Sequence, residues 1–268
     1  MRKRKGIFII VGILFLCCVV GLSYSKYVES SNKIYLKINF PKSTYKLGEI
    51  ASLGIEITNK HSEVIYLSGE AIDTMKIKIS AGSNNDFKDY YGNSRNFLVD
   101  GDYHIKINPN ETINRQQAIL WNFKPDVSGL NSDAAKPVLE GRISTDYAFS
   151  EAGTYFVKAV LILKSEEPIV IESESIKITI EEPVGKDLEV WNKIKNNGNY
   201  AYFIQEGDIR ISAYKTEERA RFQQEVEEII NQYPNSFYAE SLRQSLVKFK
   251  SNEAKKQKFL EKIQKEKP

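Results

Sequence analysis

The sequence predicts a two-domain protein in which an all-β sandwich is followed by a small all-α domain. Between residues 34 and 181, short apolar runs alternate with turn residues about every ten positions, and no helical period separates them. After Glu181-Glu182-Pro183 the apolar residues recur at steps of three and four, which is typical of helices. A basic flank with an apolar core at the N-terminus is typical of a targeting segment.

The N-terminal segment, residues 1–25, is expected to be a signal peptide or a membrane anchor. Four basic residues in positions 1–5 precede residues 6–22, which carry no charge. That apolar length lies between a signal-peptide core and a spanning helix of about 20 residues. Ser23 and Ser25 supply the small side chains that a signal peptidase reads. Cleavage and retention both stay open, and in either case the positive flank predicts export of the chain from about Lys26 onward, to the periplasm or cell surface.

Cysteine usage and charge exclude several classes of function. Cys17 and Cys18 lie within the apolar segment, and Leu16 is not the small residue that a lipoprotein signal places before its cysteine. The exported part therefore offers no disulfide, cysteine nucleophile or thiolate metal site. Four of the 38 Lys and Arg residues lie in positions 1–5, which leaves 34 against 35 Asp and Glu, a net charge of −1. This balance gives no reason to expect a nucleic-acid partner.

The expected sandwich contains about eight or nine strands. Turn residues separate the runs at 41–48 and 108–111, and Asp100-Gly101 predicts a tight turn within a hairpin over 97–105. Residues 124–145 lack regular apolar spacing and are predicted to form a loop. Apart from the hairpin, the runs from which these strands are drawn are 34–40, 50–58, 64–67, 75–80, 86–91, 118–123, 155–163, 169–171 and 176–180.

Residues 155–163 are expected to form the central strand. Their β-branched and aromatic side chains form a nearly continuous apolar run, which a strand with one solvent-exposed face would not have. Gly153 can adopt a positive φ, which allows a tight turn into the strand. The spacing of Glu151, Gly153 and Tyr155 resembles the entry to the sixth strand of immunoglobulin-like domains, where the tyrosine hydroxyl bonds back to the backbone. Val157 stands where an antibody-type domain has cysteine. The resemblance implies an immunoglobulin-like β-sandwich over residues 26–182, without an inter-sheet disulfide.

Residues 183–250 predict a small helical domain. Four helices are expected, at 187–194, 200–204 and 216–233 and after Ser236. Asp187 and Ser236 are the candidate N-caps of the first and the last of them. The Tyr-Pro-Asn-Ser turn at 233–236, followed by Tyr-Ala-Glu, resembles a tetratricopeptide-type hairpin, of which one unit is visible. Trp191 is expected in the core, wedging the helices against the sandwich or the hairpin. Residues 251–268, with six Lys and three Glu, form a charged C-terminal tail that is predicted to be a solvated helix fading into disorder. This domain order resembles exported bacterial proteins of unassigned activity, which implies an architecture alone.

Catalytic chemistry is not assembled by any recognisable motif. His61 is interpreted as a turn residue and His104 as a surface residue of a strand. Asp100 and Asp102 could offer oxygens to calcium, although a hairpin turn explains both residues. No catalytic, cofactor-binding or metal-binding residue is therefore predicted.

Other polar and aromatic groups have ordinary structural explanations. Asp86 and Asp89 beside Tyr90-Tyr91 are interpreted as an exposed loop, and Glu172 and Glu174 as solvated edge residues. A sugar-stacking platform would draw on four aromatic side chains, although Trp and Tyr are also common core residues of sandwiches. These are Tyr90, Tyr91, Trp121 and Tyr147.

The leading expectation is an exported, non-enzymatic interaction or scaffold protein of the bacterial envelope. It would bind a protein or peptide through a sheet edge or the helical groove, with a possible membrane tether. The alternatives are a carbohydrate-binding module, a proteinase inhibitor, or a hydrolase with a site in the 124–145 loop. The hydrolase would require His61 or His104 beside a carboxylate and a serine.

Overall fold

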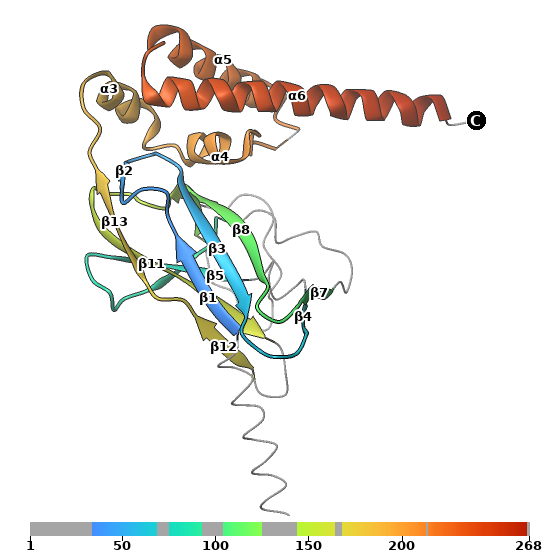
Figure 1. Ribbon diagram of the computed structural model, residues 1–268. Helices are drawn as coiled ribbons and strands as arrows, with labels where there is room; N and C mark the ends of the chain where they lie inside the picture. The colour runs from blue at the N-terminus through green and yellow to red at the C-terminus, as the bar shows by residue number, and fades with distance from the viewer. Residues whose placement is uncertain are drawn as a thin grey trace, which may run out of the picture.

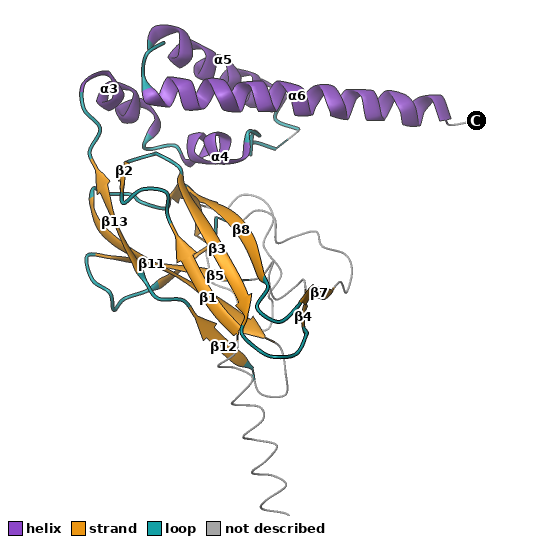
Figure 2. Ribbon diagram, viewed as in Figure 1, coloured by secondary structure: helices purple, strands orange, loops and turns teal. Residues whose placement is uncertain are grey.

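The computed structural model describes residues 34–68, 75–92, 104–124, 144–163, 168–212 and 214–266. Figure 1 shows a body of strands with helices gathered at one end, and Figure 2 shows the same division by element type. The strands are β1 (Ile34–Asn39), β2 (Thr44–Lys46), β3 (Ala51–Asn59), β4 (Ile65–Ser68), β5 (Lys76–Ala81), β6 (Lys88–Tyr90), β7 (His104–Ile107), β8 (Thr112–Ile119), β9 (Trp121–Lys124), β10 (Ser144–Tyr147), β11 (Gly153–Leu163), β12 (Ile169–Glu172) and β13 (Ile176–Glu181).

The strands form two larger sheets and two small ones. One sheet has the order β1-β3-β8, and the other has the order β2-β13-β11-β5-β6, with β12 also paired to β11. The small sheets are the pairs β9–β10 and β4–β7. All pairs are antiparallel except β2–β13, which is parallel.

The prediction that residues 155–163 form the central strand is confirmed. β11 pairs with β5 on one side and with β13 and β12 on the other. The first half of β11 alternates buried and partly exposed residues, whereas Ala159, Val160 and Leu161 are all buried. Side chains of both larger sheets, such as Ile55 of β3 and Val157 of β11, belong to one hydrophobic core. Residues 34–181 are therefore β-rich in the described parts, as expected.

The corner predicted before β11 is present. The hydroxyl of Tyr155 donates a 2.8 Å hydrogen bond to the carbonyl oxygen of Glu151. Val157, at the position that resembles an antibody cysteine, is fully buried. The corner and the apolar core together fix the entry to the central strand without a covalent link.

Four helices follow the strands: α3 (Gly185–Ile194), α4 (Gly198–Glu206), α5 (Thr216–Gln232) and α6 (Phe237–Glu266). The first half of α6 contacts α3, α4 and α5 and is the centre of this helical group. The predicted stripes are buried, through Phe222, Val226 and Ile229 of α5 and Leu242, Leu246 and Phe249 of α6. α6 continues without a break past residue 250, where the sequence suggested a domain boundary, and its second half projects beyond the other helices (Figure 1).

Three strand predictions need correction. The described residues contain 13 strands rather than eight or nine, in part because the short strands β2 and β10 carry too few residues for an alternating pattern. The strand predicted at 118–123 is two strands, and β8 already begins at Thr112. Its residues 114–117 (Asn-Arg-Gln-Gln) are polar because β8 lies at a sheet edge. The end of the predicted 124–145 loop belongs to β10.

Several sequence predictions lie outside the described residues. These are the N-terminal targeting segment, the Asp100-Gly101 turn and residues 125–143 of the predicted loop. Within the parts of the chain that the structure describes, no helix is both long enough and apolar enough to span a membrane.

Candidate functional site

The helices meet the sandwich at a junction, which we define as the contacts of Leu47 and Gly48 with Trp191 and Tyr238. Gly48 has φ +72°, and a Cβ atom there would lie 2.6 Å from the Trp191 ring. Trp191 is 4% exposed. It stacks on Tyr238 of α6 and packs edge to face against Tyr147 of β10, with ring centroids 4.8 Å apart. The prediction that Trp191 wedges the helices against the sandwich is thus confirmed.

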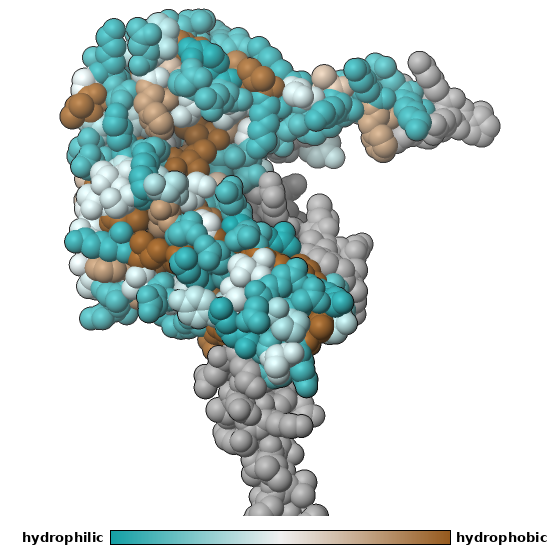
Figure 3. Space-filling view, in the orientation of Figure 1, coloured by the Kyte–Doolittle hydropathy of each residue, from teal (hydrophilic) through white to brown (hydrophobic). Residues whose placement is uncertain are grey.

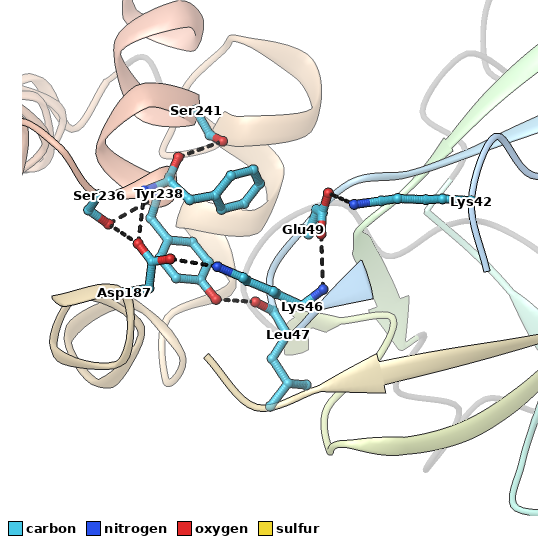
Figure 4. Close-up of polar contacts among 9 residues, drawn as sticks. Lys42, Lys46, Leu47, Glu49, Asp187, Ser236, Tyr238 and Ser241 are labelled. Carbon is cyan, nitrogen blue, oxygen red and sulfur yellow. Dashed lines mark hydrogen bonds and ion pairs between the residues drawn. The ribbon is translucent and has the colours of Figure 1, made fainter. Parts of the chain in front are cut away.

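A carboxylate ties three elements together at this junction (Figure 4). Asp187 of α3 accepts hydrogen bonds from Lys46 Nζ (2.8 Å), Ser236 Oγ (2.9 Å) and the backbone N–H of Phe237 (2.8 Å). Nearby, the Tyr238 hydroxyl donates to the carbonyl oxygen of Leu47. Burial raises the pKa of Asp187, but the hydrogen bonds from Lys46, Phe237 and Ser236 outweigh it, so the pKa lies below its ordinary value.

Asp187 therefore does not act as the sequence suggested. α3 begins two residues earlier, at Gly185, and its N-cap, Val184, makes no side-chain cap. Asp187 instead satisfies a free N–H at the start of α6, where the helix dipole favours negative charge. The candidate cap Ser236 is confirmed, because its hydroxyl accepts from Tyr238 N at 3.3 Å.

A second polar tie comes from Gln205 on α4, whose side chain is 9% exposed. Its Oε1 accepts from the backbone N–H groups of Leu120 (3.0 Å) and Trp121 (2.9 Å). Its Nε2 donates to the carbonyl oxygen of Gly92 at 2.9 Å. These bonds satisfy the backbone where β8 passes into β9, so α4 completes the hydrogen bonding of the sandwich.

Next to the junction lies a cavity of about 350 Å³, here called the junction cavity. Leu47, Tyr147, Leu188 and Trp191 supply its less polar lining. The hydroxyl of Tyr147 donates to the carbonyl oxygen of Ile194 at 3.2 Å, and burial raises the pKa of Tyr147. The wall that Tyr147 contributes is thus anchored to α3.

The polar lining of the junction cavity is mainly acidic. It includes Asp146, Glu151 and Glu182 against the single cation Lys195, and Ser150, Asn192 and Asn196 complete it. Oδ1 of Asp146 accepts from the N–H of Tyr147, so this carboxylate is partly engaged by the backbone of its own strand, β10. Three carboxylates against one ammonium leave the lining with an excess of two negative charges.

The histidines flagged by sequence are not brought into this site. His61 lies in the loop after β3, where its Nδ1 accepts from the N–H of Glu63 at 2.9 Å. His104 is exposed on β7. Neither lines the junction cavity. Asp102 and its neighbour Asp100 lie outside the described residues.

The other carboxylates singled out in the sequence lie outside the junction cavity, and two of them pair with lysines. Asp89 forms ion pairs with Lys76 and Lys78, and Glu172 pairs with Lys158 at 2.7 Å. Asp86 and Glu174 are exposed. Among the described residues, no three His, Cys, Asp or Glu side chains are grouped to hold a metal ion.

The aromatic platform considered from the sequence does not form. Tyr90, Trp121 and Tyr147 are each less than 10% exposed, and only Tyr91 among the four reaches the surface. Trp121 instead packs against Tyr202 and lies under the guanidinium of Arg210. These rings are packing groups of the sandwich and its contact with α4.

Sequence reasoning missed Gln205 and the junction cavity. Gln205 follows the predicted helix 200–204 with no pattern that marks it, and its partners are more than 80 residues away. The cavity residues come from four separate segments. Three lining residues were singled out in the sequence for other reasons: Glu151 in the spacing that predicted the Tyr155 corner, Trp191 as a core residue and Tyr147 as an aromatic candidate.

The sequence matches no protein-family model and no curated protein. Among solved structures, the chain is similar to a β-glucosidase from Erythrobacter marinus (TM-score 0.29, 9% identity), over 55% of this chain and 16% of that one. It is similar to a CARDB domain from Pyrococcus furiosus (TM-score 0.26, 10% identity), over 55% of this chain and 91% of that one. It is also similar to Spo0M, a sporulation control protein from Bacillus subtilis (TM-score 0.27, 10% identity), over 60% of this chain and 54% of that one. Such low scores assign neither an activity nor a partner to this chain.

Proposed function

We propose that this chain is an exported, non-enzymatic protein-interaction or scaffold protein. The observation that carries the proposal is the junction, where Trp191, Tyr238 and Asp187 fix the helices to the end of the sandwich. A buried, hydrogen-bonded junction presents the helical surface in one orientation. Preorganisation of this kind lowers the entropic cost of binding a partner.

We further propose that the sandwich is immunoglobulin-like. The order β1-β3-β8 corresponds to strands A-B-E of that fold, and β13-β11-β5 corresponds to G-F-C. The tyrosine corner before β11 supports the same correspondence. The antiparallel helices α5 and α6, joined by the 233–236 turn, support the resemblance to a single tetratricopeptide-type hairpin.

The N-terminal sequence supports export, and retention of that segment would tether the chain to the membrane. In Figure 1 the strand β1 starts at the end of the sandwich away from the helices. A tether attached there would hold the helices on the side facing away from the membrane.

The test is site-specific photo-crosslinking of the full chain in intact cells. A crosslinking amino acid replaces one exposed apolar residue at a time: Val184 or Val247 in the helical part, and Tyr35 or Val170 on the edge strands β1 and β12. We expect a reproducible protein neighbour from at least one of these positions. The position that yields it separates binding by the helices from strand addition at a sheet edge. Failure to recover any protein neighbour from all four positions would contradict the proposed function.

A further inference from the structure

The junction cavity has fixed walls. Tyr147 and Trp191 pack edge to face and are both buried, and Tyr147 is hydrogen-bonded to the end of α3. Leu47, also in the lining, is held through its carbonyl oxygen by Tyr238. The cavity thus exists because the two domains are docked, and interfaces between domains are places where ligand sites occur.

The charges around the cavity favour a cation. Glu151, in the corner before β11, and Glu182, in the segment before α3, both line it, and Lys195 is the one cation in its lining. The C-terminal end of α3 forms another wall, through Asn192, Lys195 and Asn196. A helix C-terminus carries partial negative charge, so the helix and the carboxylates act in the same direction.

The size of the cavity and its apolar walls suit one long basic side chain. A volume of about 350 Å³ is at the small end of ligand sites, which run from about 300 to 1,000 Å³. Lys and Arg combine a charged head with an apolar stem, so the head would meet the carboxylates while the stem lies along Leu188 and the aromatic edges. Val184, 73% exposed, extends the apolar surface at the start of α3.

We propose that the junction cavity receives a single Lys or Arg side chain from an extended segment of the protein partner. This inference rests on the proposed function and adds the chemistry of the partner. Glu151 and Glu182 bind the cationic head, and Leu188 contacts the stem. Lys195 opposes the incoming charge and limits the affinity.

The direct test follows the two tryptophan indole N–H signals of the full, detergent-solubilised chain with isotope-labelled tryptophan. The variant Trp121→Phe assigns them. The probe is N-acetyl-argininamide, with N-acetyl-norleucinamide as an uncharged control and N-acetyl-glutamate amide as an anionic control. We expect the arginine probe to shift the Trp191 signal, which comes from the cavity, and to leave the Trp121 signal in place.

Charge variants make the test specific. The double variant Glu151→Gln/Glu182→Gln should raise the titration midpoint by about fivefold to tenfold, as the loss of two exposed ion pairs predicts. Glu174→Gln/Glu189→Gln removes the same charge from exposed residues outside the cavity and should leave the midpoint unchanged. Lys195→Gln should lower the midpoint.

Three outcomes would overturn the proposal: no shift of the Trp191 signal, an equal shift with the uncharged or anionic probe, or equal losses in both double variants. The in-cell crosslinking distinguishes this failure from failure of the proposed function. If a protein neighbour is recovered undiminished with Glu151→Gln/Glu182→Gln, the interaction stands and the cavity is not its binding site. If the neighbour is lost with Glu151→Gln/Glu182→Gln but kept with Glu174→Gln/Glu189→Gln, the result supports both the proposed function and the binding of the partner at the junction cavity.

Discussion

The substitution Gln205→Leu tests whether α4 completes the hydrogen bonding of the sandwich. Leucine is close to glutamine in size but offers neither a donor nor an acceptor. It would leave the N–H groups of Leu120 and Trp121 and the carbonyl oxygen of Gly92 without their side-chain partner in a buried site. The variant therefore removes hydrogen bonds while it keeps most of the packing.

The size of the effect follows from those three backbone groups. Each buried group left without a partner costs about 1–3 kcal/mol, and partial entry of water reduces the sum. We expect a loss of about 3–6 kcal/mol in the free energy of unfolding. This is a large part of the total, because the free energy of unfolding of folded proteins is typically about 5–15 kcal/mol. The corresponding fall in melting midpoint is about 6–24 °C, at about 2–4 °C for each kcal/mol.

The assay is urea unfolding followed by tryptophan fluorescence, compared with the wild-type chain. The matched control is Gln224→Leu, because Gln224 is exposed and bonds only Glu228 on its own helix. That variant should change the free energy by no more than about 0.5 kcal/mol. A loss below about 1 kcal/mol for Gln205→Leu, or equal losses in the two variants, would refute the reasoning.

Two further predictions concern the junction. Gly48→Ala should lower the free energy of unfolding in urea by about 2–5 kcal/mol, because the new Cβ contacts Trp191 and alanine is strained at a positive φ. The control Gly82→Ala, with φ +75° and open space around it, has the backbone strain alone and should lower the free energy by about 1–2 kcal/mol. Equal losses would show that the Trp191 contact does not matter. The lowered pKa of Asp187 predicts stabilisation that is fully present above the unfolded pKa of about 3.9 and lost as the pH falls through the folded pKa. Unfolding at several pH values should therefore show the difference between wild type and Asp187→Asn shrinking in acid, and a constant difference would contradict this account.

Local patterns predicted most of the regular elements. The alternation in β3 placed Leu53, Ile55 and Ile57 in the core, and the spacing around Gly153 placed the corner that Tyr155 closes. These predictions succeed because burial of one face sets a period of two in a strand and about 3.6 in a helix. Alternation did not predict the start of β8, because most of this polar edge strand has no buried face and its sequence therefore does not alternate between apolar and polar residues.

The candidate site was much less predictable. Asp187 has the residue type and position of a helix cap, yet its partner is a different helix, about 50 residues further along the chain. The chemistry of a carboxylate near free N–H groups was correctly anticipated. Which helix supplies those N–H groups depends on the docking of α6 against α3, and no local pattern encodes that choice.

The charge pattern of α6 illustrates the same division. Its second half is rich in Lys and Glu, and the space-filling view shows the projecting arm as mainly hydrophilic (Figure 3). The sequence predicted that solvated character. Phe259 is 64% exposed on this arm, and the helix expected after Ser251 is the continuation of α6 through residue 266.

The sequence by itself determined that a β-rich region precedes helices, which residues form the central strand, and where Trp191 and the 233–236 turn lie. Periodicity, turn residues and caps act between neighbours along the chain, so they can be read without coordinates. Only the tertiary structure decided that Gln205 reaches the β8–β9 turn, that Asp187 caps α6, and that Glu151 and Glu182 flank one cavity. Those contacts join residues from distant segments, and their energies exist only after the sandwich and the helices have packed together.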